Sequence, residues 1–316
     1  MVYKTISYKP GDLVLFLLAK QLIECLPDKL GVIMKMPFLA LIVTLLILPL
    51  TVSAMTVEQL ASQLGRNDLI IYDSRSKADY DAGHIPGAIS FPFEQAYYSK
   101  DKALYIKGRT QITSLLREKG LEREKRVILY DDGDLISAAR LYWILTLYGH
   151  DDVTVFESGY NSWIKAQPSE RQESKVASSH FAPNFDASVY ASTTLVKLAT
   201  YSKNYTILDA RSLDEYRGNK SMSSTYGRIP SSLHFPVSAL ISEKSGQPVL
   251  KSNRELTPVI SQLERNKKYI TYCNLGKNST LSFYVLKRAG FDVALYDGSW
   301  IDWSMKKLPV EQEKGQ

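Results

Sequence analysis

The sequence predicts an α/β protein built from two similar domains, each a parallel sheet flanked by helices. Three observations lead to this prediction: landmarks repeat along the chain, short apolar runs alternate with amphipathic stretches, and a polar segment without any period separates the copies. The landmarks recur in the same order at a separation of about 140 residues, which indicates a duplicated domain. The matching segments are 69–92 with 206–219 and 227–236, 126–134 with 268–276, and 156–163 with 296–303.

In the second copy the predicted elements follow one another in a regular order. The apolar run 205–208 predicts a strand, the amphipathic stretch 256–263 a helix, and the β-branched and aromatic run 269–272 a buried strand. Apolar residues then recur at helical spacing over 279–288, and 293–296 predicts a third strand. Strands that alternate with helices favour a parallel sheet covered on both faces, which binds ligands beyond the carboxyl ends of its strands.

Residues 1–54 predict a leader and not part of a folded domain. A positive residue precedes an uncharged apolar run, 37–50, and small residues follow as far as Ala54, which is the layout of a secretory signal peptide cleaved after Ala54. Residues 1–33 would be an upstream extension if translation starts at a methionine just before the apolar run. An uncleaved membrane anchor over 37–50 is the alternative. We therefore expect an exported protein, either periplasmic or secreted.

The mature chain divides into a first copy at 55–167, a linker at 168–186 that is rich in Ser, Pro and charge, and a second copy at 187–310. Without the five basic and three acidic residues of the leader, 34 Lys and Arg remain against 30 Asp and Glu, and the basic residues are scattered. This charge pattern gives no reason to expect a nucleic-acid partner. We expect a monomer that has no contact with a membrane once the leader is cleaved.

Cys273 is the strongest candidate for a functional residue. It follows the strand 269–272, and a short polar loop, 274–278, leads from it into the helix 279–288. Backbone N–H groups in such a loop lack helical partners and attract negative charge, which favours a reactive thiolate over an inert thiol. A small buried cysteine at a strand end is the alternative. The other cysteine, Cys25, lies in the predicted leader, so the mature protein would hold one thiol and no intramolecular disulfide.

Four landmarks in this order carry a resemblance to a known family. They are an Asp-x-Arg after a strand, a downstream element that reads GHIPGA in the first copy, a cysteine loop before a helix, and a closing Asp-Gly-Ser-Trp element. The positions are Asp73, Arg75 and 83–88 in the first copy, and Asp209, Arg211, 227–230, 273–278 and 297–303 in the second. Over essentially all of residues 55–309 the chain resembles the rhodanese family in its two-domain form, the thiosulfate and 3-mercaptopyruvate sulfurtransferases.

The resemblance implies that only the second copy is catalytic, because Asp131 of the first copy aligns with Cys273 and a carboxylate cannot accept a sulfur atom. The implied reaction is sulfur transfer, in which the Cys273 thiolate takes the outer sulfur of a small anionic donor as a persulfide and passes it to cyanide or a thiol. Backbone N–H groups of 274–278 would hold that sulfur. This chemistry needs neither a metal nor an organic cofactor, and the first domain would close one wall of the cleft.

The identity of the sulfur donor stays open at this point. By the same resemblance, thiosulfate enzymes carry basic residues directly after the cysteine, whereas mercaptopyruvate enzymes carry small ones. The loop here has Asn274 and Leu275 at those positions and departs from both types. Lys277 restores one positive charge, so we expect thiosulfate, with 3-mercaptopyruvate as the alternative. A persulfide carrier or thiol sensor without turnover is a third alternative.

The predicted substrate-binding residues come from the cysteine loop and from two flanking elements, and they are Asn274, Gly276, Lys277, Asn278, Arg211 and His84. Arg211 matches a family arginine that contacts anionic substrate; a surface ion pair is the alternative. His84 lies in an element where the family places cleft-facing groups, and a structural, hydrogen-bonded histidine is the alternative. Arg228 occupies the matching position in the second copy, where we expect it to be solvated. Trp300 and Trp303 are expected to pack in the core.

Some dual-specificity phosphatases share the rhodanese fold, but the sequence excludes that function. Their loop runs from the cysteine through five residues to an arginine that holds phosphate with two N–H groups. Six positions after Cys273 the chain has Ser279, and the next arginine is Arg288. The residues therefore predict a sulfurtransferase and not a phosphatase.

Overall fold

The computed structural model describes residues 54–244 and 246–313. The predicted leader, with its start codon and the apolar run at 37–50, lies outside the described residues. Within the described ranges, no helix is both long enough and apolar enough to cross a membrane.

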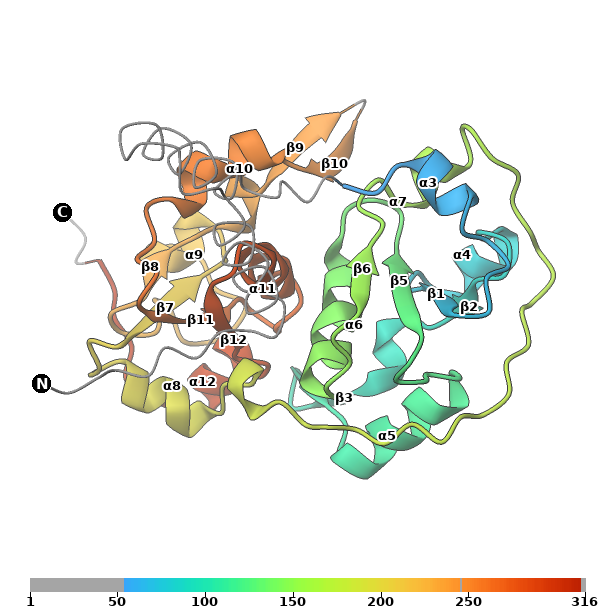
Figure 1. Ribbon diagram of the computed structural model, residues 1–316. Helices are drawn as coiled ribbons and strands as arrows, with labels where there is room; N and C mark the ends of the chain where they lie inside the picture. The colour runs from blue at the N-terminus through green and yellow to red at the C-terminus, as the bar shows by residue number, and fades with distance from the viewer. Residues whose placement is uncertain (1–53, 245, 314–316) are drawn as a thin grey trace, which may run out of the picture. The chain divides into compact units, whose positions relative to one another are not determined.

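The first domain is a four-stranded parallel sheet with helices on both faces (Figure 1). The strands lie in the order β2 (Ile89–Ser90), β1 (Leu69–Asp73), β5 (Arg126–Tyr130) and β6 (Val153–Val155). The helices are α3 (Val57–Ala61), α4 (Lys77–Ala82), α5 (Arg109–Glu118), α6 (Ile136–Leu147) and α7 (Gly159–Trp163). Along β1, Ile70 and Tyr72 pack in the cluster that contains α5 and α6, whereas Ile71 packs in the cluster that contains α3 and α7. Burial on both faces explains why these strands are nearly continuous apolar runs.

The second domain repeats this arrangement. Its strands lie in the order β12 (Asp292–Leu295), β11 (Lys268–Tyr272), β7 (Tyr205–Asp209) and β8 (Leu233–His234), all parallel. Its helices are α8 (Thr193–Ala199), α9 (Leu213–Arg217), α10 (Asn253–Ile260), α11 (Ser279–Arg288) and α12 (Ser299–Met305). Tyr269 of β11 faces the cluster with α11, and Ile270 and Tyr272 face the cluster with α12. The predicted fold, two domains that each have a parallel sheet flanked by helices, is confirmed.

The predicted elements of the second copy agree with the structure except for one helix. The strands expected at 205–208, 269–272 and 293–296 are β7, β11 and β12, and the helix expected at 279–288 is α11. The helix expected at 256–263 is wrong by three residues at each end, because α10 occupies Asn253–Ile260. Its start is set by Ser252, whose hydroxyl accepts the Glu255 N–H while the Glu255 carboxylate accepts the Ser252 N–H.

Each domain also carries an antiparallel hairpin that the sequence pattern does not predict. β3 (Tyr97–Lys100) pairs with β4 (Ala103–Ile106), and β9 (Ile241–Lys244) pairs with β10 (Gln247–Leu250). A 3-10 helix precedes each hairpin, η1 (Phe93–Ala96) in the first domain and η3 (Val237–Ala239) in the second. Of the first hairpin only Tyr97 and Ala103 are buried, so its strands show little hydrophobic alternation.

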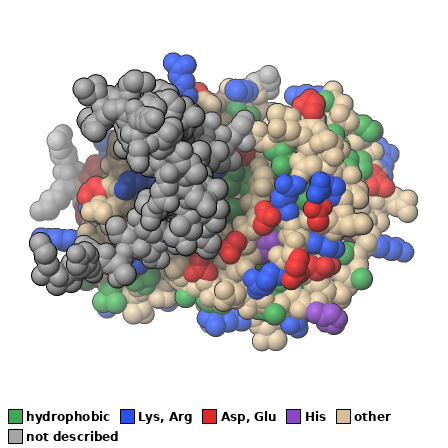
Figure 2. Space-filling view, viewed as in Figure 1, with side chains coloured by type: hydrophobic (Ala, Val, Ile, Leu, Met, Phe, Trp, Pro, Cys, Tyr) green, Lys and Arg blue, Asp and Glu red, His purple; other side chains and the backbone are tan. Residues whose placement is uncertain are grey.

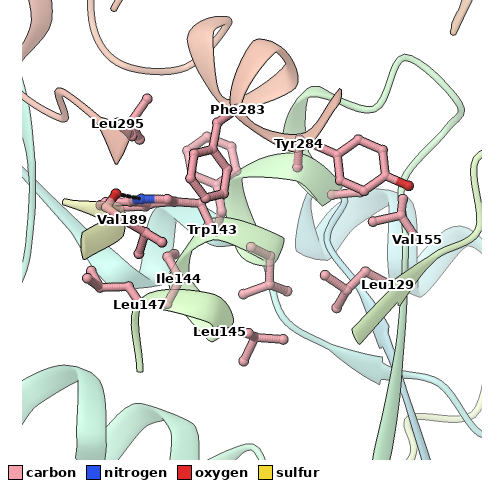
Figure 3. Packing of buried hydrophobic residues seen from close by; sticks show 14 of the residues in the cluster. Leu129, Trp143, Ile144, Leu145, Leu147, Val155, Val189, Phe283, Tyr284 and Leu295 are labelled. Carbon is pink, nitrogen blue, oxygen red and sulfur yellow. Dashed lines mark hydrogen bonds between the residues drawn. The ribbon is translucent and has the colours of Figure 1, made fainter. Parts of the chain in front are cut away.

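The inner faces of the two domains share one hydrophobic core. Helices α6 and α11 pack against each other, and side chains from both domains belong to a single buried cluster. Figure 3 shows Trp143 of α6 in this cluster together with Phe283 and Tyr284 of α11. The indole N–H of Trp143 donates to the backbone carbonyl of Val189 at 2.9 Å. Because Val189 lies just before the second sheet, this bond ties the start of the second domain to a helix of the first.

Residues 168–186, all of them within the described part of the chain, contain no helix or strand and are fastened to the first domain. Phe181 is buried, and its carbonyl accepts an N–H from Arg117 at 2.8 Å. Glu170 forms an isolated β-bridge with His84, and its carboxylate accepts the Gly87 N–H at 3.0 Å. The connection between the two sheets is therefore a strap packed on the first domain.

Charged side chains of both signs are interspersed over the described surface visible in Figure 2. Several form exposed pairs within one element or turn, such as Arg66 with Asp68 and Lys77 with Asp81. Exposed pairs of this kind contribute about 0–1 kcal/mol to stability. The domains are thus held together by the apolar core and by the buried polar contacts described below.

Candidate active site

Cys273 lies at the carboxyl end of the second sheet, directly after β11. Its neighbour Tyr272 pairs in register with Asp209, the last residue of β7, so loops that leave two adjacent strands meet beside the thiol. A cavity of about 420 Å³ opens there. It is lined by Ala210, Arg211, Ser212, Glu215, Met222, Pro236, Val237, Ser238, Cys273, Asn274, Leu275, Lys277 and Asn278. The sheet edge that the sequence predicts as a ligand site therefore holds a cavity with the cysteine in its wall.

The backbone of Cys273 is fixed by the start of α12. Its N–H donates to the Ser299 hydroxyl at 3.2 Å, and its carbonyl accepts the Trp300 N–H at 2.9 Å. The Ser299 hydroxyl in turn donates to the Tyr296 carbonyl at 2.8 Å. Cys273 is 4% exposed and is one of the residues that line the cavity. The closing Asp-Gly-Ser-Trp element thus positions the cysteine, and Trp300 and Trp303 are buried in the core as predicted.

The loop between Cys273 and α11 offers a set of unused hydrogen-bond donors. The backbone N–H groups of Asn274 through Asn278 have no acceptor among the residues that the structure describes. Partners begin only inside the helix, where the N–H groups of Thr280 and Leu281 donate to carbonyls of the loop. Five free N–H groups between a strand end and a helix start form the kind of arrangement that binds an anion.

Asn274 is held by an acidic residue that sequence reasoning missed. The Asn274 amide donates to the Glu215 carboxylate at 2.8 Å, and the second oxygen of Glu215 accepts from the Ser212 hydroxyl at 2.7 Å. Burial alone would raise the pKa of Glu215, but the hydrogen bonds from Ser212 and Asn274 lower it below the ordinary value. Glu215 therefore places a negative charge in the cavity wall. The Ser-x-x-Glu spacing of 212–215 signals the helix cap but not the contact with the loop.

Arg211 is buried and mostly occupied by its own strand end. Its Nε and Nη2 contact the Asp209 carboxylate, with Nη2 at 2.6 Å, and Nη2 also donates to the Gly227 carbonyl at 2.9 Å. Its guanidinium carbon lies 4.5 Å from the Trp300 ring centroid. In the described part of the chain, Nη1 has no partner. Arg211 is one of the residues that line the cavity, but its side chain is fully buried. It braces two loops, and Nη1 is a buried donor without a partner.

The remaining loop residues divide by position. Lys277 and Asn278 line the cavity. The Lys277 ammonium lies 5.0 Å from the ring centroid of Phe93, so a side chain of the first domain reaches the cysteine loop. Gly276 contributes backbone only, with φ +70°, a conformation that favours glycine.

Two predicted positions lie elsewhere. His84 is buried in the first domain, where its ring stacks on Tyr80 at 3.7 Å and its Nδ1 lies 2.9 Å from the Tyr80 carbonyl. His84 does not line the cavity and has the position of a structural, hydrogen-bonded histidine. Arg228 is 8% exposed and pairs with Glu311, so the expectation that it is solvated is wrong. The reason is that a segment near the C-terminus covers this position, since Arg228 forms an isolated antiparallel β-bridge with Glu311.

In the first domain, a carboxylate occupies the position equivalent to Cys273. Asp131 follows β5 as Cys273 follows β11, and the strand pairs Asp73 with Tyr130 and Asp209 with Tyr272 are equivalent. The buried Asp131 carboxylate accepts three backbone N–H groups, from Gly133 at 2.9 Å, Leu135 at 3.2 Å and Ala138 at 3.0 Å. In the first domain, the backbone N–H groups that could bind an anion thus donate to the Asp131 carboxylate.

Arg75, the equivalent arginine of the first domain, also pairs with carboxylates. Nη2 of Arg75 donates to the Asp73 carboxylate and to the Gly83 carbonyl. Nη2 of Arg211 donates in the same way to the Asp209 carboxylate and to the Gly227 carbonyl. Nη1 of Arg75, however, pairs with Asp132 at 3.4 Å. The residue that follows Cys273 in the second domain is the uncharged Asn274, which leaves Nη1 of Arg211 free. In the first copy, carboxylates thus accept from the loop and from Nη1 of the arginine. In the second copy, the N–H groups of 274–278 and Nη1 of Arg211 have no partner among the described residues.

No three His, Cys, Asp or Glu side chains of the described residues cluster as metal ligands would. Cys273 is the free cysteine of this part of the chain, and Cys25 lies outside it. The site therefore consists of a thiol, backbone and side-chain donors, one ammonium group and one carboxylate.

Comparisons with known proteins agree with the duplicated fold. The family model described as "Rhodanese-like domain" matches residues 56–166 and again 193–306. A protein of Saccharopolyspora erythraea named "Putative thiosulfate sulfurtransferase" is 32% identical over 253 residues, which cover 75% of this chain and 88% of that protein. A protein of the same name from Mycolicibacterium smegmatis is 30% identical over 247 residues, covering 73% and 87%. The crystal structure of the 3-mercaptopyruvate sulfotransferase SseA from Escherichia coli superposes with a TM-score of 0.67 at 24% identity, covering 78% of this chain and 99% of that one.

Proposed function

The chain belongs to the rhodanese-like domain family, with two copies of the domain, and on that premise we propose that it transfers a sulfane sulfur from thiosulfate to cyanide or a thiol through a persulfide on Cys273. The observation that carries this proposal is the contrast between the two copies. In the first copy, Asp131 accepts N–H groups of the loop and Asp132 pairs with Arg75. In the second copy, the loop N–H groups after Cys273 and Nη1 of Arg211 have no partner among the described residues. Homologues named as thiosulfate sulfurtransferases support the assignment to sulfur transfer.

The proposed reaction has two steps. The Cys273 thiolate attacks the outer sulfur of thiosulfate, the S–S bond of thiosulfate breaks, and sulfite leaves with the bonding electron pair. Cyanide then attacks the outer sulfur of the persulfide, thiocyanate leaves, and the thiolate returns. In each step one bond to the transferred sulfur forms, one S–S bond breaks and the departing group keeps the bonding electron pair, so neither step needs an external oxidant or reductant.

The residues around the cavity have separate tasks in this scheme. The backbone N–H groups of the loop 274–278 have no protein acceptor and would hold negative charge on the transferred sulfur. The Lys277 ammonium would bind the sulfonate oxygens of thiosulfate, and the buried guanidinium of Arg211 would add positive charge behind the cavity wall. No metal or organic cofactor takes part in these steps.

One observation favours a second donor. Glu215 puts a carboxylate in the same cavity wall as Lys277, and a dianion is repelled more strongly by it than a monoanion is. Thiosulfate is a dianion, whereas 3-mercaptopyruvate carries one carboxylate. 3-Mercaptopyruvate is therefore the alternative donor, and the choice depends on whether Lys277 or Glu215 dominates the potential in the cavity.

Steady-state sulfur transfer to cyanide, with thiosulfate and 3-mercaptopyruvate compared side by side, tests the proposal. We expect kcat/KM for thiosulfate to exceed that for 3-mercaptopyruvate. The opposite order would assign the mercaptopyruvate activity. Absence of turnover with both donors, while Cys273 still reacts with a thiol probe, would leave the protein as a persulfide carrier or thiol sensor and would refute the enzyme assignment.

Lys277→Met should raise KM for thiosulfate about tenfold, because the change removes one ammonium group from the wall that faces a dianion. The effect on 3-mercaptopyruvate should be smaller, since its single negative charge gains less from Lys277. Increasing ionic strength should weaken thiosulfate binding in the wild type more than in the variant. Lys287→Met, which changes a lysine near the other end of α11, is the matched control and should leave both KM values unchanged. Equal losses for both donors would contradict the electrostatic role.

A further inference from the structure

An arginine of the first domain reaches into the catalytic loop of the second. Arg140 lies on α6 and is fully buried. Its Nη1 donates to the backbone carbonyl of Gly276, and its Nη2 donates to the Asp297 carboxylate at 2.8 Å. Its guanidinium carbon lies 4.0 Å from the ring centroid of Tyr97, on the hairpin of the first domain. One side chain of the first domain therefore bonds both the cysteine loop and the turn that precedes α12.

The contact leaves the loop almost no freedom at Gly276. A Cβ atom added there would lie 2.4 Å from the Asp297 carbonyl oxygen and 2.8 Å from Nη1 of Arg140. Asp297 is held from the first domain as well, because its carboxylate accepts the Ile106 N–H at 2.9 Å. Burial raises the pKa of Asp297, and Arg140 acts against that rise by stabilising the ionised form. The loop, the turn and Arg140 thus form one close-packed unit.

The hydrogen bond from Arg140 to the Gly276 carbonyl also fixes the direction of the Lys277 N–H. In a trans peptide the C=O of one residue and the N–H of the next lie in one plane and point in opposite directions. No cis peptide bond occurs in the described residues. Because Arg140 holds the Gly276 carbonyl, the Lys277 N–H must point away from Arg140. Arg140 does not line the cavity, whereas Lys277 does.

Resting on the sulfur-transfer function proposed above, we propose that Arg140 is a positioning residue for the reaction. It fixes the peptide plane between Gly276 and Lys277, and so keeps the Lys277 N–H available to the negative charge on the sulfur of Cys273. The residues that line the cavity all belong to the second domain, so the first domain would act on the site by setting the direction of a donor in the cysteine loop.

The start of α6 shows how the first domain holds Arg140 in place. The Asp131 carboxylate accepts the N–H of Ala138, two residues before Arg140 on the same helix. The residue at the position equivalent to Cys273 therefore bonds the first turn of the helix that carries Arg140.

Arg75 provides a matched control for the cost of removing a buried arginine. It is 6% exposed, pairs with Asp73 at 2.6 Å and lies 3.8 Å from the Tyr160 ring centroid. Its hydrogen-bond partners among the described residues all belong to the first domain. A general loss of stability should therefore appear in Arg75→Met and Arg140→Met alike, whereas loss of positioning should appear only in Arg140→Met.

The experiment compares Arg140→Met, Arg140→Lys and Arg75→Met with the wild-type chain, at a temperature where circular dichroism shows each of them folded. Steady-state kinetics give kcat and KM for the better donor, and alkylation by iodoacetamide gives the reactivity of Cys273 without any donor. We expect Arg140→Met to lower kcat at least tenfold and to slow alkylation, with a smaller change in KM. Arg140→Lys should fall between, because lysine keeps the charge near Asp297 but cannot bridge two acceptors as a guanidinium does.

A kcat for Arg140→Met within about twofold of that for Arg75→Met would overturn the proposal, and so would unchanged alkylation in both Arg140 variants. If Arg140→Met does not fold, Arg140→Lys decides by the same criteria. If the wild type turns over neither donor, the proposed function fails, while the alkylation rates still test whether Arg140 positions the loop.

Discussion

Replacing Cys273 by serine should lower the rate of sulfur transfer by at least about 10³-fold with either donor. A serine hydroxyl has nearly the same size as a thiol but is not ionised at neutral pH, and it cannot form the S–S bond that carries the sulfur. Because the residue is 4% exposed and its backbone is tied to Ser299 and Trp300, the exchange should leave the fold intact. Thiocyanate formation from cyanide measures the loss.

The covalent step can be tested separately from turnover. After incubation with thiosulfate and without acceptor, the intact mass of the wild type should increase by one sulfur atom, and that of Cys273→Ser should not. Cys25→Ser is the matched control, since it removes the chain's other thiol, and it should keep both the activity and the mass increase. Sulfur transfer by Cys273→Ser at a rate near the wild type would refute the persulfide mechanism.

The fold could be predicted because its strands and its repeat leave strong local signals. Strands β7, β11 and β12 are apolar runs buried on both faces, and each landmark occurs twice in the same order. The hairpin β3–β4 could not be predicted, since only one residue of each strand is buried and the pairing depends on a turn at Asp101 and Lys102, both with positive φ. Local patterns report burial, and these strands have little of it.

The candidate site could be predicted in part, namely where its residues are close together in the sequence. Cys273, Asn274, Lys277 and Asn278 belong to one loop, so the strand–loop–helix pattern places them together at the sheet edge. Arg140 could not be found in this way, because its partner Gly276 is 136 positions away in the sequence and an arginine in a helix carries no local sign of burial. Glu215 was missed for the same reason, since its contact with Asn274 spans 59 positions.

The wrong expectation about Arg228 has the same physical origin. An arginine that follows a glycine in a polar segment appears solvated unless a partner from elsewhere covers it, and here Glu311 does so from near the end of the chain. His84 was grouped with the loop by resemblance, and it is instead enclosed by Tyr80 and bridged to Glu170. Both cases show that burial of a charged or polar side chain is decided by tertiary partners and not by its neighbours in the sequence.

The two copies differ in the partners of their loop N–H groups. In the first copy the Asp131 carboxylate accepts two N–H groups of its loop and one N–H group of α6. In the second copy the N–H groups of 274–278 have no protein partner in the described chain, a state that costs folding free energy unless a ligand or solvent satisfies them. The duplicated domain thus contains one loop that bonds its own carboxylate and one loop whose donors are unpaired among the described residues.

Asp131 should make the stability of the protein depend on pH between about 4 and 7. Burial raises the pKa of Asp131 from 3.8 to about 7; the nearby Asp134 carboxylate adds to the rise, and the N–H groups of Ala138, Gly133 and Leu135 oppose it. In this window the folded protein therefore binds a proton that the unfolded chain releases. Stability from this group is complete below pH 4 and is lost as the pH rises through 7, by up to about 4 kcal/mol at about 1.4 kcal/mol per pKa unit.

Asp131→Asn isolates this contribution, because asparagine keeps the shape and one oxygen acceptor but does not titrate. Urea unfolding of both proteins at several values between pH 4 and pH 8, followed by far-ultraviolet circular dichroism, gives the two free energies of unfolding. The wild type should lose stability relative to Asp131→Asn as the pH rises, and the difference should level off above pH 8. Parallel curves would show that the Asp131 carboxylate is ionised throughout, held in that form by the three N–H donors despite its burial. The first loop would then resemble an occupied anion site even more closely, with a permanent charge where the second loop awaits its ligand.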